Sequence, residues 1–370
     1  MKILHVVTSL EPGGMENGLV NVARALDPSQ FEVHVACLER TGAFAERLPD
    51  PEKVTVLGKK SGFSQRAVFR LAGEISRIRP ALIHSHNLGP LIYSSLATLG
   101  GTTCPILHGE HSSLTEEECS PKRLRQRRWL YHCCSSVHTV AHGLSRHLVE
   151  LGFPPEKITT IVNGVDLHRF APGDRSDARR QSGIPADAFV IGIVGRFGPF
   201  KRHALLLEAF ARLGSDYPEL HLLIVGGGGS EQSEISEKAR THPHATRIHL
   251  AGFQKNPVPF YQSMDLLAVP SVNEGLSNAV LEAMACGVPV LANSACGNGD
   301  VIVSGVDGMV ADLGTSEKLR EQLSLYLAKP EFLRAIGNRA AQKAVSAYSI
   351  DQMVAGYVEL YRRTGNRKSR

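Results

Sequence analysis

The chain of 370 residues is 42% hydrophobic and 21% charged, and its formal net charge is +5. This length exceeds what one hydrophobic core usually supports, so two domains are expected. The composition excludes a disordered chain, and the modest charge without a basic, aromatic-rich stripe argues against a nucleic-acid-binding protein.

No apolar stretch reaches the roughly 18 to 20 residues that a membrane-spanning helix needs. The apolar run at 3–7 is too short for a signal-peptide core and lacks a small-residue cleavage site. The seven cysteines form no CxxC pair and no zinc-type spacing with histidine. We therefore expect a cytoplasmic protein with reduced thiols and no integral membrane segment.

In the first half of the chain, short β-branched runs alternate with amphipathic stretches, a pattern typical of parallel sheets with helical crossovers. The predicted strands are residues 3–8, 32–38, 54–57, 82–85, 105–108, 138–140 and 158–162. Turn-forming residues replace this periodicity at 163–173, and we place a domain boundary there.

The second half restarts the same rhythm. Strands are predicted at 189–194, 220–225, 248–251, 266–269 and 289–292, with helices at 201–213, 231–240, 257–263 and 276–286. After residue 319 the chain is predicted to be helical, and periodicity does not assign the last helix, at 351–363, to either domain. The predicted fold class is α/β, with two doubly wound, Rossmann-like domains.

A glycine pair, Gly13 and Gly14, lies between the first strand and a predicted helix at 17–26. Such a loop lets backbone amides approach an anion at the helix N-terminus. A tight structural turn without a ligand explains the pair equally well, because the loop is not GxGxxG.

Two cations follow the first strand of the second half, Arg196 directly and Lys201 near the next helix. Ligands of open α/β sheets bind beyond the carboxyl ends of the strands, so both cations are suited to a diphosphate. A solvated basic turn is the alternative. The sequence contains no Asp-x-Asp pair, so no divalent metal is expected at this diphosphate.

The segment 269–287 carries the most information. Glu274 and Gly275 lie where a strand end meets a helix start, and the amides of 275–278 are suited to an anion or a sugar hydroxyl. Glu282 follows about 12 Å along the same helix face, too far for a paired acid and base on one bond. The spacing suits two hydroxyl-bearing parts of one extended ligand, or else an ordinary N-terminal acid and an unrelated helical glutamate.

The segment from Glu274 to Glu282 resembles the Glu-x7-Glu signature of glycosyltransferase family 4, whose fold is GT-B. Gly14, the Arg196/Lys201 pair and the segments 163–166 and 297–300 follow in the family's order, so the resemblance covers nearly the whole chain. It implies two Rossmann-like domains that face a central cleft. Residues 1–165 would form the acceptor domain and 166–350 the nucleotide-sugar domain, with a helix at 351–370 crossing back to the first.

The resemblance also implies a retaining, metal-independent transfer from a nucleoside diphosphate sugar, with no cofactor. Arg196 and Lys201 would hold the diphosphate, Glu282 the ribose and Glu274 the donor sugar, with Phe253 near the base. The donor-binding residues implied in this way are Gly14, Arg196, Lys201, Phe253, Glu274, Gly275, Leu276, Ser277, Asn278 and Glu282. Leu276, Ser277 and Asp300 depart from common family residues and leave the donor sugar open.

The family also places a histidine after a central strand of the first domain, near the anomeric carbon. Counting from Pro105 favours His111, and His108 is the alternative. Since the leaving phosphate itself can deprotonate the acceptor in a retaining transfer, His111 would orient and polarise. The implied catalytic residues are His111, Glu274, Arg196 and Lys201, and none is expected to bind a metal.

The predicted function is therefore transfer of a sugar, with UDP as the expected carrier, to a polysaccharide, lipid-linked or small-molecule acceptor. A nucleotide-sugar epimerase or a phosphorylase of the same fold is a rival enzyme class. A non-catalytic sugar-nucleotide binding subunit is a third hypothesis, and the presence of both glutamates and both cations argues against it.

The basic run at 121–131 contains the only tryptophan of the chain, Trp129. A solvated helix face explains such a run. The alternative is a peripheral contact with anionic lipid at the inner face of the membrane.

Overall fold

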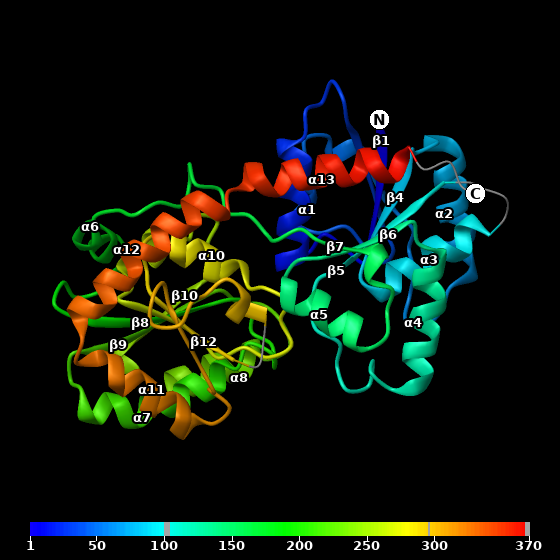
Figure 1. Ribbon diagram of the computed structural model, residues 1–370. Helices are drawn as coiled ribbons and strands as arrows, with labels where there is room; N and C mark the ends of the chain where they lie inside the picture. The colour runs from blue at the N-terminus through cyan, green and yellow to red at the C-terminus, as the bar shows by residue number, and fades with distance from the viewer. Residues whose placement is uncertain (100–103, 295–296, 367–370) are drawn as a thin grey trace. The chain divides into compact units, whose positions relative to one another are not determined.

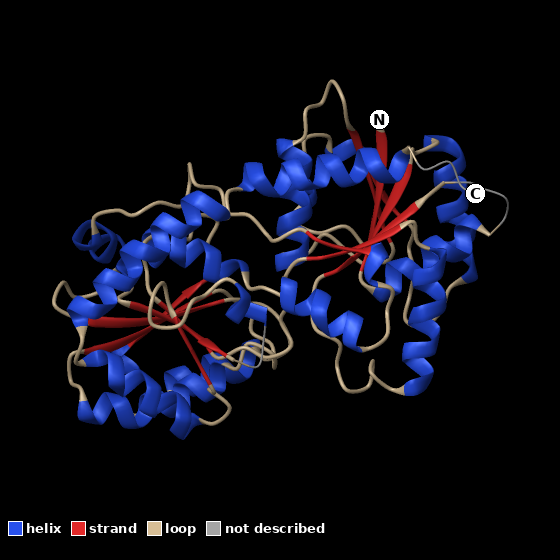
Figure 2. Cartoon of the chain, in the orientation of Figure 1, coloured by secondary structure: helices blue, strands red, loops and turns tan. Residues whose placement is uncertain are grey.

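The computed structural model describes residues 1–99, 104–294 and 297–366. The chain divides into two compact units. Unit 1 comprises Met1–Gly164 with Ile350–Arg370, and unit 2 comprises Val165–Ser349. In each unit the strands form a central sheet with helices around it (Figure 2).

The sheet of unit 1 has seven parallel strands in the order β3-β2-β1-β4-β5-β6-β7. Each predicted strand is present, with ends shifted by at most two residues. Their bounds are β1 (Lys2–Val7), β2 (Glu32–Cys37), β3 (Val54–Val56), β4 (Leu82–His86), β5 (Ile106–Glu110), β6 (Ser136–Thr139) and β7 (Ile158–Thr160).

Helices cover both faces of this sheet, because alternate residues of each strand point to opposite faces and most residues of both sets are buried. In β1, Leu4 and Val6 join a core with residues of the second to fifth helices, whereas Ile3 packs with residues of the last helix. The helices of unit 1 are α1 (Gly14–Ala25), α2 (Gln65–Ile78), α3 (Leu88–Thr98), α4 (Pro121–Cys133), α5 (His142–Glu150) and α13 (Ile350–Gly365).

The last helix, α13, lies beside α1 and β4 (Figure 1). Its apolar side chains Met353, Tyr357 and Tyr361 are buried against the unit 1 sheet in one core with Ile3 and Leu82. The chain therefore returns to unit 1 after completing unit 2, a feature that helical periodicity alone did not assign.

The sheet of unit 2 has six parallel strands in the order β10-β9-β8-β11-β12-β13. Its strands are β8 (Phe189–Val194), β9 (Leu220–Val225), β10 (Ile248–Gly252), β11 (Leu266–Val269), β12 (Val290–Asn293) and β13 (Met309–Ala311). Its helices are α6 (Arg175–Ser182), α7 (His203–Asp216), α8 (Gln232–Arg240), α9 (Val258–Ser263), α10 (Asn278–Ala285), α11 (Ser316–Leu327) and α12 (Pro330–Ala347).

Two elements of unit 2 were not predicted from sequence. The strand β13 has only three residues and pairs at the sheet edge with β12. The helix α6 is almost entirely polar, and it begins where the Asp174 side chain accepts hydrogen bonds from the amides of Ser176 and Asp177. Neither element carries the long apolar period on which the prediction rested.

Within the ranges that the structure covers, no helix is both long enough and apolar enough to cross a lipid bilayer.

Candidate functional site

The loops after three strands of unit 2 contact one another at the carboxyl edge of the sheet. The Gly195 amide donates to the carbonyl of Val225, and a Cβ on Gly226 would lie 2.0 Å from the Gly195 carbonyl oxygen. The amide of Gly226 in turn donates to Gly252. Only glycine permits this close approach, so the loops after β8, β9 and β10 form one continuous backbone surface.

An ion pair joins two of the predicted site residues at this edge. The ammonium group of Lys201 contacts a carboxylate oxygen of Glu274, and it lies 3.4 Å from the hydroxyl oxygen of Ser277. The stem of Lys201 packs over Gly195. The second carboxylate oxygen of Glu274 is buried and has no hydrogen-bond partner among the residues that the structure describes. A buried carboxylate oxygen without a donor is costly, so this position is suited to a ligand that supplies a hydroxyl.

Arg196, just after β8, supplies a second cation at this sheet edge. Its side chain is exposed and has no ion pair or hydrogen bond among the described residues, although its stem packs on Gly229. Phe253, directly after β10, is 58% exposed. A free guanidinium and an open aromatic face at one sheet edge are suited to phosphate and to a planar base, respectively.

The start of α10 differs from the sequence-based expectation. The amide of Ser277 is not open to a ligand, because it donates to the side-chain oxygen of Asn298 over 2.8 Å. Asn298 is fully buried, and a Cβ on Gly297 would lie 1.7 Å from the Gly275 carbonyl oxygen. The short 297–300 segment therefore fixes the loop that carries Glu274, a role that no local pattern in the sequence indicated.

Glu282, one turn from the end of α10, is held by a buried tyrosine. The hydroxyl of Tyr261 in α9 donates to Oε2 of Glu282 over 2.6 Å. Burial, together with the charge of Glu282, raises the pKa of Tyr261 well above its ordinary value, so this hydroxyl stays a donor. The second glutamate of the predicted pair is thus held in a fixed orientation.

In unit 1, Gly14 is the first residue of α1, where an anion was considered from sequence. The structure brings the carboxylate of Glu16 over this terminus, since a Cβ on Gly13 would lie 2.2 Å from Oε2 of Glu16. Gly14 lies in unit 1, whereas Arg196, Lys201, Glu274 and Glu282 lie in unit 2.

His111 directly follows β5, which extends two residues further than predicted. Its Nε2 lies 2.9 Å from Nδ1 of His86, and burial lowers its pKa to about 4. The alternative, His108, is fully buried inside β5, with its ring nitrogens 3.1 Å from Ser85 and from Glu110. Of the two histidines, His111 is the one at the carboxyl end of the strand and the less enclosed.

Glu110 is the centre of a buried polar cluster that sequence analysis missed. Its carboxylate accepts hydrogen bonds from Arg127 and Tyr131, and Arg127 also reaches Glu118 at 3.0 Å. Burial alone would raise the pKa of Glu110, but Arg127 and the hydrogen bonds lower it to about 2. The sequence signal that could have indicated this cluster is a charged residue, Glu110, at the end of an apolar strand.

Arg127 also changes the interpretation of the basic run at 121–131. This side chain is 1% exposed, and Leu130 and Tyr131 are buried in the core, so the run is not a uniformly exposed basic face. Trp129 is 53% exposed, and its exposed basic neighbours on α4 are Lys122, Arg123, Arg125 and Arg128.

Family models match both halves of the chain. The model described as Glycosyltransferase Family 4 matches residues 12–169, and the model described as Glycosyl transferases group 1 matches residues 174–343. The chain belongs to glycosyltransferase family 4. The resemblance based on the Glu274 to Glu282 segment is thereby confirmed.

Curated relatives of this family 4 member include a D-inositol 3-phosphate glycosyltransferase of Segniliparus rotundus. It is 33% identical over 56% of this chain and 47% of its own length. This chain spans about half the length of the first such relatives. A D-inositol 3-phosphate glycosyltransferase 2 of Catenulispora acidiphila is 26% identical over 98% of this chain and 92% of its own length.

Solved structures show the same fold over the whole chain. Anabaena HepE, crystallised with UDP and glucose, aligns with 98% of this family 4 chain and 99% of its own, at a TM-score of 0.85 and 23% identity. A sucrose-phosphate synthase from Thermosynechococcus elongatus aligns with a TM-score of 0.80. The two α/β units therefore have the GT-B glycosyltransferase fold, as the sequence predicted.

We expect Glu110→Gln to lower the free energy of unfolding by about 3 to 5 kcal/mol, because it leaves Arg127 buried beside an uncharged partner. The matched control is Glu118→Gln, which changes a 36% exposed carboxylate on the same arginine and should cost about 1 kcal/mol or less. Urea denaturation measures both. Equal losses in the two variants would contradict a dominant role for the buried pair.

His203, at the start of α7, should make the stability of the fold depend on pH. Burial, and then the nearby Lys201, lower its pKa from 6.5 to about 4. Between about pH 6.5 and pH 4, the His203 imidazole is therefore protonated in the unfolded chain and neutral in the native state. As a result, the free energy of unfolding falls as the pH decreases through this window. From pH 7 to pH 5 this one group should cost about 2 kcal/mol.

Denaturation of the wild type and of His203→Leu at both pH values measures this effect. The variant should lose less stability on acidification, and the control His142→Leu, at an exposed position, should behave like the wild type. An unchanged pH dependence in His203→Leu would contradict the neutral, buried imidazole.

Proposed function

We propose that this chain is a retaining glycosyltransferase that transfers a sugar from a nucleoside diphosphate donor without a divalent metal. The observation that carries the proposal is the contact between Lys201 and Glu274, with one oxygen of Glu274 buried and unpartnered. Family membership supports it, since both family models describe glycosyltransferases.

In the proposed donor complex, Lys201 exchanges its carboxylate partner for a phosphate oxygen. Arg196, which has no partner in the described structure, supplies the second positive charge. Together the two cations would stabilise the charge that develops on the leaving diphosphate, which is the role that preorganised charges play in transfer enzymes. Released from Lys201, Glu274 would accept hydrogen bonds from donor-sugar hydroxyls.

The remaining assignments are those that the family resemblance implies. We assign Phe253 to the base, Glu282 to the ribose hydroxyls, and the loop 275–278, except for the Ser277 amide that Asn298 holds, to the donor sugar and diphosphate. From unit 1 we assign His111 to the reacting sugar, as an orienting and polarising group. The hydrogen-bond partner of His111, His86, would fix which ring nitrogen carries its proton.

The donor is proposed to be a UDP-sugar. HepE, which shares the fold, has been crystallised with UDP and with UDP-glucose. The acceptor is proposed to be a polysaccharide, a lipid-linked glycan or a small molecule, and relatives of the chain are named for transfer to D-inositol 3-phosphate.

We expect Lys201→Met and Glu274→Gln each to lower transfer by about 100-fold or more, as loss of a charge-stabilising group does elsewhere. The matched control is the exposed pair Lys238 and Glu234 on α8, joined at 2.8 Å. Lys238→Met and Glu234→Gln should keep full activity. Nucleotide release is measured with UDP-, GDP- and ADP-sugars and an acceptor panel that includes D-inositol 3-phosphate.

Wild-type turnover in both site variants would contradict the proposal. Formation of an epimerised donor in the absence of acceptor would identify an epimerase instead. Tight donor binding without turnover on any acceptor would identify a binding subunit. The anomeric configuration of the product, determined by NMR, tests retention.

We also propose a peripheral contact between α4 and anionic lipid. Exposed cations lie on the same helix as the exposed ring of Trp129, and each cation near an anionic surface contributes about 1 kcal/mol. Arg127 does not contribute to this surface, because it is buried in its ion pairs.

Sedimentation with lipid vesicles tests the contact. The chain should sediment with phosphatidylglycerol-rich vesicles and remain in solution with phosphatidylcholine vesicles. A double variant, Arg125→Glu with Trp129→Ala, should lose this binding and keep its thermal stability. Equal binding to both vesicles, or no binding to either, would leave α4 as a solvated helix face.

A further inference from the structure

A cluster of histidines covers one face of the unit 1 sheet, on the side of α13. They come from β1, from β4, from β6 and from the residue after β5, at positions that share one strand face. The cluster comprises His5, His84, His86, His111 and His138. Apart from His111, each of them is 3% exposed or less.

The strand between β4 and β6 makes room for this cluster by carrying a glycine. A Cβ on Gly109 would lie 2.5 Å from Nε2 of His138 and 2.9 Å from Nε2 of His111. Because this Cβ is absent, Nε2 of His84 approaches Nε2 of His138 to 2.8 Å across β5. From α13, the hydroxyl of Tyr361 lies 3.1 Å from Nδ1 of His84.

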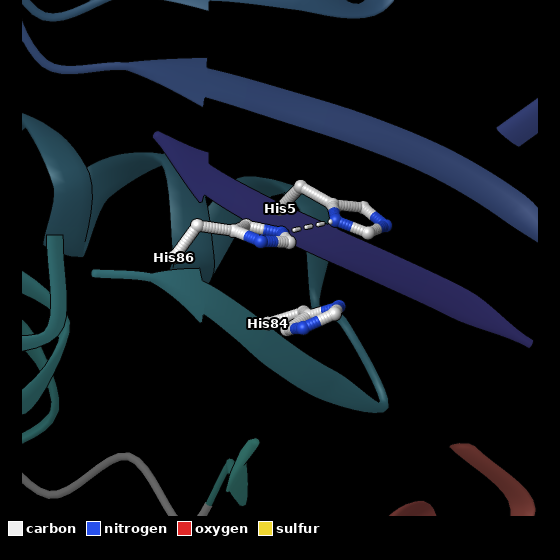
Figure 3. A group of neighbouring side chains, drawn as sticks. All are labelled: His5, His84 and His86. Carbon is white, nitrogen blue, oxygen red and sulfur yellow. Dashed lines mark hydrogen bonds between the residues drawn. The ribbon is translucent and has the colours of Figure 1, made fainter. Parts of the chain in front are cut away.

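Three members of the cluster come together most closely. One ring nitrogen from each of His5, His84 and His86 lies within 4.8 Å of the others, and Figure 3 shows the three rings gathered between β1 and β4. Nδ1 of His5 is 2.9 Å from Nε2 of His86. Two buried nitrogens of the cluster, Nε2 of His5 and Nδ1 of His138, have no partner among the described residues.

We propose that His5, His84 and His86 bind one divalent transition metal ion of the Zn²⁺ class. Three nitrogens at about 2.0 to 2.1 Å from a tetrahedral Zn²⁺ are about 3.3 Å apart, so small ring rotations from the present positions would bring all three to the metal, and a water molecule would take the fourth position. A ligand set of imidazoles alone favours Zn²⁺, Cu²⁺ or Ni²⁺ and disfavours Mg²⁺ and Ca²⁺, which prefer oxygen.

The protonation state of the cluster is the one that a metal requires. Burial lowers the pKa of His5 to about 3 and lowers the pKa values of His84 and His86 well below the ordinary value. Neutral imidazole is the form that ligates metals, and no proton must be displaced from it near neutral pH.

Two of the three ligands also have partners for their other nitrogen. With Nε2 of His86 on the metal, Nδ1 faces His111 at 2.9 Å. His84 has Tyr361 on one ring nitrogen and His138 on the other, so whichever nitrogen is free of the metal has a partner. Such outer contacts orient metal-binding histidines in proteins. The site lies in unit 1 and does not depend on the proposed glycosyl transfer.

Metal titration of the full chain tests the proposal. Protein freed of metal with a chelator is dialysed against Zn²⁺ or Co²⁺, and bound metal is measured by elemental analysis. We expect one equivalent per chain and a Co²⁺ absorption spectrum of a tetrahedral site without thiolate bands. A folded chain that binds no stoichiometric metal, or a spectrum with thiolate ligation, would overturn the proposal.

Variants locate the metal. His5→Gln and His86→Gln should each lower Zn²⁺ affinity by at least about tenfold, because each removes one of the three proposed ligands. The matched control is His221→Gln with His249→Gln, which removes another histidine pair, 2.9 Å apart, in unit 2. Unchanged affinity in the cluster variants, or loss of metal in the control, would overturn the site.

If the glutamine variants fail to fold, the stoichiometry of bound metal and the Co²⁺ spectrum of the wild type decide the question. A neutral, hydrogen-bonded network that binds no metal is the result expected if the proposal is wrong. Metal content is measured without any sugar donor. A failed metal titration therefore does not contradict the proposed transfer activity, and a failed transfer assay does not contradict the metal site.

Discussion

The close approach of three glycine-containing loops at the carboxyl edge of the unit 2 sheet is the constraint on which the site depends. Neighbouring backbone leaves no space for a Cβ on Gly226, which lies against the Gly195 carbonyl, or on Gly297, which lies against the Gly275 carbonyl. Lys201 and Glu274 are in contact at the same edge. An opposite-charge pair with one unsatisfied buried oxygen is a poor structural contact and a good receptor for an anionic, hydroxyl-rich ligand.

Unit 1 uses the same α/β architecture for a different polar arrangement. Its sheet carries a buried carboxylate, Glu110, held by Arg127, and beside it a face of neutral histidines around Gly109. Polar groups in a sheet that is buried on both faces are costly unless they are partnered. The number of buried histidines on this sheet face suggests that the face binds a ligand. His111 lies at the edge of this face.

The sequence was sufficient for the fold and the family, because strands of a doubly wound sheet are apolar runs and the Glu-x7-Glu spacing is distinctive, whereas the candidate site residues stay predictions. It could not reveal contacts between distant segments. The Asn298 side chain on the Ser277 amide, the Glu16 carboxylate over Gly13 and the burial of Arg127 all depend on tertiary packing. The polar helix α6 and the three-residue β13 were missed because neither has an apolar period long enough to detect.

The central claim is that fixed cations and backbone amides of unit 2 bind a diphosphate without a metal ion. Calorimetric titration of the wild type with UDP, UMP and uridine, all in excess EDTA, tests it most directly. The account predicts that affinity rises with each phosphate, so that UDP binds at least about tenfold, or 1.4 kcal/mol, more tightly than uridine. Equal affinities for UDP and uridine, or UDP binding that appears only after a divalent ion is restored, would contradict it.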